Sequence, residues 1–388
     1  MKTAFWLYLF LFIAFFDLHA QSPVLTPFAL SLGAAPTFIG WMMGLYALTH
    51  LPGNLIAGYG VDRHGSRRYI MTSLILAGIV LLLQAHATEP WHLLVLRSIS
   101  GFVIAFLSPA CMSLLASLSD DSVKQGKYMA GHGVVHTLAS VLSPAAGAFL
   151  VAKIGFGQTF QALGIGLIGA AVVAYFTVRE RGKVSIKPAD HLAPKPFSPD
   201  AFQHQGSMQP ISWRYFLLPF AIACSQGILF FELPLRVHDQ SNILSIGFLF
   251  SILSLGALVT LSMLFLQQYD PTKRVAGGVL LIALCFFILS APWHIPIEVP
   301  LFIMGMAKGI VFPAMASLFI TLSGGKSLGL VFSLQSIAMS LGSFAGPIIS
   351  GHVRMEISPY FIAFIILMSI LVVVPISRNI LNVKPVSR

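Results

Sequence analysis

The sequence predicts an all-α membrane protein of twelve transmembrane helices, arranged as two parallel six-helix repeats with both termini in the cytoplasm. Three observations support this fold class. Only 9% of the 388 residues are charged and 56% are hydrophobic, whereas about a quarter of the residues of a typical soluble domain are charged. Apolar runs of about 20 residues, the length that a helix needs to cross a bilayer, recur along the chain. The two halves of the chain also repeat one another.

The expected spans follow from hydropathy and from the positions of breaker residues. In chain order they are 4–27, 37–60, 69–87, 91–117, 126–152, 157–178, 213–236, 243–267, 274–292, 296–321, 326–350 and 357–378. The first span imitates a secretory signal peptide. It contains Asp17, however, and continues through Pro23 and Pro27 in a pattern that the second half repeats. We therefore interpret it as a transmembrane helix.

The distribution of basic residues predicts the orientation. With the N-terminus in the cytoplasm, three of the 23 Lys and Arg residues fall in outside loops, namely Lys153, Arg236 and Arg354. Two more, Arg97 and Lys308, fall within spans, which leaves eighteen of the 23 on the cytoplasmic side. This asymmetry satisfies the positive-inside rule. The net charge of +10 is then explained by topology, and no nucleic-acid partner is expected.

Short sequence patterns recur between the two halves. Residues 101–119 and 305–323 share their first Gly, a Pro-Ala pair and a closing Ser at one fixed offset, and Gly40 similarly matches Gly247. Six spans in each half with the same orientation predict two parallel repeats, which in transporters hold the substrate between them. The expected domains are residues 1–178, a polar cytoplasmic linker over residues 179–212, and residues 213–388.

The loop after the second span has an ordered set of Gly, Asp and Arg residues. These are Gly58, Asp62, Arg63, Gly65, Arg67 and Arg68. Glycine permits tight turns and close approach, and an acid near a helix end can interact with basic groups or with a helix N-terminus. A loop whose basic residues serve only to orient the chain in the membrane would explain the arginines, but it would not explain the order of the Gly, Asp and Arg residues. Here the chain resembles the major facilitator superfamily, in which this loop is a cytoplasmic latch between the halves. The twelve-span layout extends the resemblance over the whole chain and implies the major facilitator fold.

Four charged residues are expected at membrane depth: Asp17, Arg97, Glu232 and Lys308. Each costs about 2.5–3.5 kcal/mol on insertion scales unless it is paired or hydrated. We predict that Asp17 carries protons, because a nearby Arg97 would keep the carboxylate ionised and separation of the two would favour proton binding. Glu232 and Lys308 are expected in the substrate cavity, although a purely structural role is the alternative for both pairs. Glu232 lies nearer the external surface, so Lys308 would need its full length to reach it.

The resemblance to the superfamily supports the proton-coupling hypothesis. Arg97 and Gly101 are similar to the helix-four motif, whose Arg is implicated in proton transfer. Asp17, followed by Pro23 and Pro27, is similar to the first-helix pattern of twelve-helix drug:proton antiporters. The resemblance thus implies proton coupling through Asp17 and Arg97.

The ends of the fifth and eleventh spans are rich in Pro and Gly. They contain Pro144 and Gly147 in the first half and Gly346, Pro347 and Gly351 in the second. These ends resemble the antiporter motif of the superfamily, although Ser143 replaces the usual Gly before Pro144. Pro removes a helix hydrogen bond and Gly removes bulk, so these positions are expected to bend and to pack closely. Ordinary helix packing is the alternative explanation.

His132 and His136 lie four residues apart on the fifth span. This spacing could place two imidazoles on one metal ion, but no third ligand lies nearby in the sequence. A polar helix face that lines an aqueous cavity is the simpler interpretation, and His19 is expected in the same cavity. Neither a metal site nor a cofactor is expected.

The favoured hypothesis is a proton-coupled exporter of small amphipathic compounds that works by alternating access. Its expected partners are a small-molecule substrate, protons and the lipid bilayer of a cell membrane, in which it would function as a monomer. A dedicated carrier of one polar metabolite, organic anion or metal-chelating compound is the alternative, and a lipid flippase is another. The sequence has no nucleotide loop, metal cluster or nucleophile–base set, so we do not expect an enzyme.

Overall fold

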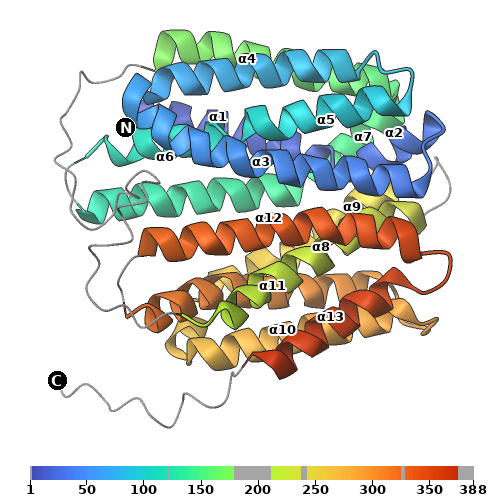
Figure 1. Cartoon of the computed structure of the whole chain (residues 1–388). Helices are drawn as coiled ribbons and strands as arrows, with labels where there is room; N and C mark the ends of the chain where they lie inside the picture. Colours follow the sequence, from blue (N-terminus) through green and yellow to red (C-terminus); the bar gives the residue numbers. More distant parts are fainter. Residues whose placement is uncertain (1, 120–121, 179–210, 237–242, 325–327, 375–388) are drawn as a thin grey trace, which may run out of the picture.

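The computed structural model describes residues 2–119, 122–178, 211–236, 243–324 and 328–374, which are almost entirely helical. Most of the expected linker, residues 179–210, lies outside the described residues. The helices of the first half are α1 (Lys2–Ala20), α2 (Leu25–Ser31), α3 (Pro36–His64), α4 (Ser66–Gln84), α5 (Pro90–Ile104), α6 (Leu107–Ala116) and α7 (Ser122–Thr177). Those of the second half are α8 (Leu217–Arg236), α9 (Ile243–Ser262), α10 (Pro271–Ser290), α11 (Glu298–Leu322), α12 (Leu328–Val353) and α13 (Pro359–Val373). The helices run roughly parallel to one another in two groups (Figure 1).

Each of the twelve expected spans coincides with a helix, with part of one or with two consecutive helices. Within the described residues, nine helical stretches are long and apolar enough to cross a membrane by length and composition. Nine of the twelve expected spans correspond to these stretches. The other three correspond to α3, to the short apolar helix α13 and to the second of the two spans that run together in α7. The predicted class, an all-α protein with many membrane spans, is confirmed.

Proline and glycine explain where the helices depart from the expected spans. The first span is interrupted after Ala20 and resumes as α2, and the fourth is divided into α5 and α6. Pro23 and Pro109 each lack the N–H that would bond to the carbonyl group four residues earlier, which lies just before each break. The fifth and sixth spans are continuous in α7 except at Gly155, where φ is 81° and ψ is 171°. Only glycine adopts this conformation readily.

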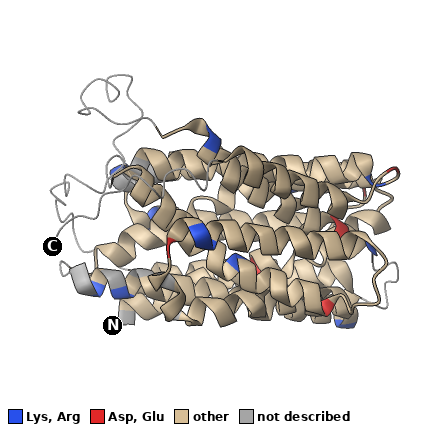
Figure 2. Ribbon diagram, turned by 90° about the horizontal axis from the view of Figure 1, so that it is seen from below, with Lys and Arg blue, Asp and Glu red and all other residues tan. Residues whose placement is uncertain are grey.

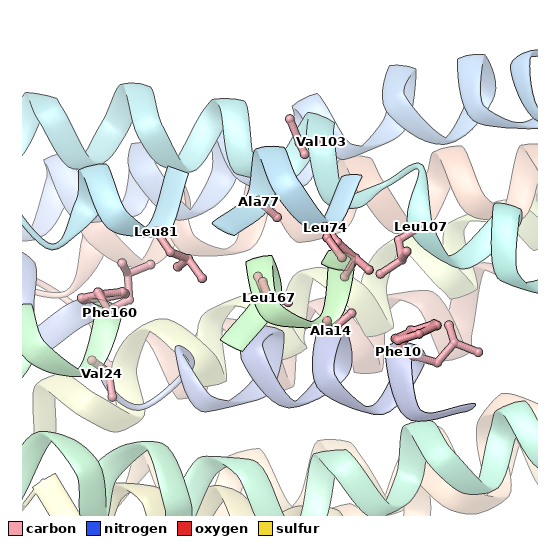
Figure 3. Close-up of a cluster of buried hydrophobic side chains, with 14 of the residues drawn as sticks. Phe10, Ala14, Val24, Leu74, Ala77, Leu81, Val103, Leu107, Phe160 and Leu167 are labelled. Atoms are coloured by element: carbon pink, nitrogen blue, oxygen red, sulfur yellow. The ribbon is translucent and has the colours of Figure 1, made fainter. Parts of the chain in front are cut away.

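Two clusters of buried apolar side chains form the interior. The first is built from α1 to α7, and Figure 3 shows Phe160 near Leu81 at one end of it and Phe10 at the other, with Leu74 between them. The second cluster is built from the helices that follow residue 211. Phe231 and Ile243 belong to the second half but pack against the first cluster. The two halves therefore meet near the end of α8 and the start of α9.

Two long seams join the halves, one between α3 and α12 and the other between α7 and α9. At Gly40, an added Cβ atom would lie 2.5 Å from the carbonyl oxygen of Pro347. At Gly247, it would lie 2.5 Å from the carbonyl oxygen of Pro144. Gly40 and Gly247 are the equivalent positions of the two repeats, so the two seams use the same glycine-on-proline contact.

Candidate functional site

Few charged residues lie along the middle of the helices, most of which are drawn in tan in Figure 2. Asp17, Arg97 and Glu232 are 5%, 7% and 6% exposed, and Lys308 is half-buried. A buried charge is costly without a partner. The partners of these four residues therefore define the candidate site.

Asp17 and Arg97 are linked through a glutamine. The Nε2 atom of Gln21 donates a hydrogen bond of 2.8 Å to Oδ1 of Asp17. The guanidinium group of Arg97 donates one of 2.6 Å to Oε1 of Gln21. These two described charges do not form a direct ion pair, because the 2% exposed amide of Gln21 lies between them. Sequence reasoning missed Gln21, whose only signal was its position one helical turn after Asp17.

Arg97 also lies over the ring of Tyr46 on α3, with the guanidinium carbon 4.2 Å from the ring centroid. Gly101, one turn along the same helix, faces the carbonyl oxygen of Tyr46, and any Cβ atom there would collide with it. The spacing of Arg97 and Gly101 thus has a physical basis. The glycine lets α5 approach α3, and this approach places the arginine on the aromatic face, where a cation–π interaction stabilises it.

Glu232 on α8 has partners at the end of α12. The hydroxyl group of Ser350 donates a hydrogen bond of 2.8 Å to its Oε1 atom, and Nε of Arg354 lies 3.7 Å from the same oxygen. Among the described residues, Lys308 is not a partner of Glu232. Sequence counting had placed Arg354 in an outside loop, so its approach to a buried carboxylate was not foreseen.

Arg354 also lines a cavity of about 660 Å³ between the halves. Its other walls include Pro27 and Pro36 from the first half and Pro234 and Ile246 from the second. The Glu232–Arg354 ion pair therefore borders a space to which both halves contribute.

A third group of polar side chains contains the predicted histidines. The ring of His136 lies 5.2 Å from that of His19 and 4.6 Å from that of Phe15, measured between centroids. His132 packs on the same phenylalanine at 5.5 Å, and its Nε2 atom lies 3.4 Å from Oγ of Ser108. The structure thus brings the three histidines together on α1 and α7.

Lys308 lies on α11 and is half-buried. Its Nζ atom lies 5.6 Å from the ring centroid of Phe230. Among the described residues, no group of three or more His, Cys, Asp or Glu side chains could hold a metal ion. Three of the five residues predicted for the substrate cavity, the histidines, therefore lie in one group, whereas Lys308 and Glu232 have other neighbours.

The loop between α3 and α4 contains the predicted latch. Gly65 joins the two helices with φ 92° and ψ 147°. Arg67 donates a hydrogen bond of 2.6 Å to the carbonyl oxygen of Tyr175 and lies 5.3 Å from the centroid of its ring. Arg67 therefore attaches the start of α4 to the end of α7. The surroundings of Gly58 and the side chain of Asp62 lie outside the described part of the structure.

Substituting Gly65 with Ala is expected to destabilise the protein by about 1–3 kcal/mol, since this backbone conformation is nearly exclusive to glycine. The thermal midpoint of the purified protein in detergent measures the effect. Gly277, which has no atom within 4 Å of an added Cβ and has an ordinary helical backbone, provides the matched control. Equal losses in Gly65→Ala and Gly277→Ala would contradict the prediction.

The predicted Pro-Gly ends pack closely against neighbouring helices. An added Cβ atom at Gly147 would lie 2.5 Å from the carbonyl oxygen of Ala20, and one at Gly351 would lie 2.9 Å from that of Pro36. Gly346 faces the carbonyl oxygen of Cys224 in the same way. Two of these contacts lie within a half and one crosses between the halves, so the small residues allow close packing in both places.

Comparison with known proteins gives a consistent result. A family model described as the Major Facilitator Superfamily matches residues 7–347. The quinolone resistance protein NorA of Staphylococcus aureus is 22% identical over 391 residues, which cover 97% of each chain. The solved structure of a peptide transporter of the POT type in complex with alafosfalin has a TM-score of 0.76 at 15% identity and covers 96% of this chain and 94% of that one.

A bacterial homologue of the human lysosomal transporter Spinster is also similar in fold, with a TM-score of 0.71 at 15% identity, covering 96% of this chain and 94% of that one. At these identities the solved structures establish the fold alone. The family match, by contrast, spans most of the chain and includes α1, α3 and α5, which carry Asp17, the start of the latch loop and Arg97. The chain is a multi-pass membrane transporter rather than an enzyme, and it belongs to the Major Facilitator Superfamily.

Proposed function

We propose that the protein is a proton-coupled exporter of small amphipathic compounds. In this proposal residues 1–178 and 213–388 are the two moving units of an alternating-access cycle, and both termini are cytoplasmic. The observation that carries the proposal is the buried chain of Asp17, Gln21 and Arg97. The name of NorA, a quinolone resistance protein, supports efflux as the direction of transport.

The chemistry of this chain suits a proton carrier. A carboxylate that is 5% exposed needs hydrogen bonds or a nearby cation to stay ionised. Here a neutral amide supplies the hydrogen bond and connects the carboxylate to Arg97. A proton on Asp17 removes the charge that strengthens this connection. Protonation can then shift α1 relative to α5, because it changes the relative stability of the two arrangements.

The proposal also assigns a side of the membrane to the contacts between the halves. The glycine-on-proline contacts lie at the starts of α3 and α9. With cytoplasmic termini, these helix starts face the outside. The two contacts then hold the halves together near their outside ends.

Transport driven by a pH gradient tests the proposal. Purified protein is reconstituted into vesicles, and the movement of a panel of amphipathic fluorescent dyes, cationic and anionic, is followed under an imposed gradient. We expect at least one dye to accumulate against its concentration gradient and a protonophore to abolish the accumulation. Accumulation that a protonophore leaves unchanged would exclude proton coupling.

Gln21 is expected to act as a positioning residue for Asp17 and Arg97. Gln21→Leu keeps the side-chain size but removes both hydrogen bonds, and a hydrogen bond to a charged group contributes about 1.5–3 kcal/mol, or roughly 10- to 100-fold in an equilibrium. We expect a loss of this size in gradient-driven transport, together with a changed pH profile, which a purely structural defect would not produce.

Gln84 on α4 provides the matched control for this substitution. It is 0% exposed, and both of its side-chain polar atoms lack a hydrogen-bond partner in the described structure. Gln84→Leu therefore removes a buried glutamine without removing a hydrogen bond of this kind. Equal transport losses and unchanged pH profiles in both variants would assign Gln21 a structural role only.

A further inference from the structure

We propose that the cavity between the halves is a binding site for an amphipathic organic anion, whose charged group pairs with Arg354 and whose apolar body occupies the cavity. The site shares no residue with the buried chain of Asp17, Gln21 and Arg97, so the inference does not depend on proton coupling. It follows from the size and lining of the cavity and from the free hydrogen-bond donors of Arg354.

The cavity has the size and the lining of a small-molecule site. Its volume is about 660 Å³, which lies within the range of about 300–1,000 Å³ that is usual for ligand pockets. Apart from Ser31 and Arg354, the side chains that line it are apolar, and they include Phe156 from the first half and Ile246 from the second. An apolar space with one charged group in its wall favours a ligand with an apolar body and a single charge.

The end of α12 places Arg354 at this wall. Three residues earlier, a Cβ atom added at Gly351 would lie 2.9 Å from the carbonyl oxygen of Pro36, so α12 ends directly against the first half. Pro36 itself lines the cavity. The side chain of Arg354 is 20% exposed, and its charge is therefore accessible to a ligand in the space where the halves meet.

Arg354 retains free hydrogen-bond donors. Its Nε atom lies 3.7 Å from Oε1 of Glu232, which is too long for a hydrogen bond. Its terminal nitrogen atoms make no hydrogen bond within the described part of the chain. A guanidinium group has five N–H donors and binds planar or tetrahedral anions through two parallel hydrogen bonds. An anionic ligand can therefore bind Arg354 without displacing Glu232.

Glu232 does not present its charge to the cavity. Its side chain is 9% exposed, and the residue is not part of the cavity wall. Its Oε1 atom also accepts a hydrogen bond from Ser350. The charged group that a ligand meets is thus the cation of Arg354, which favours an anion over a cation of the same shape.

A ligand in this cavity would contact both halves of the chain. Pro27 and Phe156 belong to the first half, and Pro234 and Ile246 belong to the second. A ligand that touches both walls stabilises the arrangement described here relative to one in which the walls separate. We therefore expect the bound anion to slow the transport of other compounds, a consequence that rests on the alternating-access cycle of the proposed function.

Equilibrium binding of a matched pair of probes to the purified full-length protein tests the inference. Naphthalene-2-sulfonate and (naphthalen-2-yl)trimethylammonium share an aromatic body and differ in charge. We expect the sulfonate to bind and to raise the thermal midpoint. The ammonium compound should bind at least about 10-fold more weakly, as expected from the loss of a charge-assisted contact.

Charge variants then identify the group that binds the sulfonate. Arg354→Gln is expected to weaken binding about 10- to 100-fold, the effect of losing a charge-assisted hydrogen bond. Glu232→Gln should instead tighten binding by up to about 5-fold, because it removes a loose ionic partner of Arg354. Lys153→Gln is the matched control, since Lys153 is an exposed cation next to the lining residue Ala152 but is not part of the wall itself.

A size variant tests the cavity without changing any charge. Ala152 lines the cavity, and Ala152→Phe places a ring in the space that the naphthalene body would occupy. We expect sulfonate binding to weaken by at least about 10-fold, as expected from the loss of the apolar contact. The thermal midpoint of the ligand-free variant shows whether the protein still folds.

Four results would overturn the inference: equal or tighter binding of the cation, binding of neither probe, unchanged sulfonate binding in both Arg354→Gln and Ala152→Phe, or an equal loss in Lys153→Gln and Arg354→Gln. Binding at equilibrium needs no pH gradient, so a failure of proton coupling would leave the site in place. Transport that is unchanged at saturating sulfonate would contradict the expected link between the site and the transport cycle.

Discussion

Replacing Asp17 with Asn is expected to reduce gradient-driven transport to the level of empty vesicles while leaving downhill exchange of cargo in place. Asn is nearly the same size as Asp and can still accept a hydrogen bond from Gln21, but it cannot bind and release a proton. The substitution therefore removes the coupling step and preserves the packing. Uptake into reconstituted vesicles with and without an imposed pH gradient measures the two activities separately.

Asp270 is the matched control for this substitution. It caps the N-terminus of α10, where it accepts hydrogen bonds from the backbone N–H groups of Thr272 and Lys273 at 2.7 and 3.2 Å. Burial acts to raise the pKa of Asp270, but these two hydrogen bonds, together with the hydroxyl group of Thr272 and the charge of Lys273, hold the pKa below its usual value. The side chain thus stays ionised near neutral pH, and Asn caps helices as well as Asp does.

Asp270→Asn should therefore leave both activities close to those of the parent protein. Gradient-driven accumulation that persists in Asp17→Asn would remove this carboxylate from the mechanism. Loss of downhill exchange as well as accumulation would instead show that Asp17 is needed for cargo binding or folding, and the thermal midpoint would separate these two causes.

Placing Leu at Gly40 or Gly247 is expected to produce the second large effect, a near-complete loss of turnover. An added Cβ atom at either position would lie 2.5 Å from a proline carbonyl oxygen across the seam. Backbone atoms cannot move aside as a flexible side chain can, so the halves must separate at this end. The variants should fold, since each half retains its own apolar cluster, but the arrangement described here should be lost.

Two measurements check this prediction. Transport assays report turnover, and the distance between spin labels on the two halves reports whether this end has opened. Gly169→Leu and Gly277→Leu are the controls, one in each half, because an added Cβ atom at either position has no neighbour within 4 Å. Normal transport in Gly40→Leu and Gly247→Leu would mean that the seams do not need close contact during the cycle.

The spans and the buried charges could be predicted from the sequence because both depend on local composition. A run of about 20 apolar residues is a strong requirement of the bilayer, and an Asp or Arg within such a run stands out. Gln21 does not stand out in this way, since a neutral amide at the end of a span carries little cost. The break between α5 and α6 was predictable in principle from the missing N–H of Pro109.

The partners of Glu232 could not be predicted, because they depend on how α8 packs against α12. Ser350 lies 118 positions away along the chain, and nothing local marks it as a partner. Arg354 lies just after α12, close enough to the helix end to reach Glu232. Counting basic residues by side predicts that Arg354 lies in an outside loop, and it gives no information on which way the side chain points.

The paired contacts of Gly40 with Pro347 and Gly247 with Pro144 have a mechanical consequence. Two points of contact define a line, and rigid bodies that touch along a line can pivot about it without losing either contact. The chain would then need no flexible hinge within a helix in order to open its far end. The repeats place a glycine at both contacts, so the halves approach equally closely at each of them. A bulky side chain at only one contact would hold the halves apart there and change the axis of the rotation.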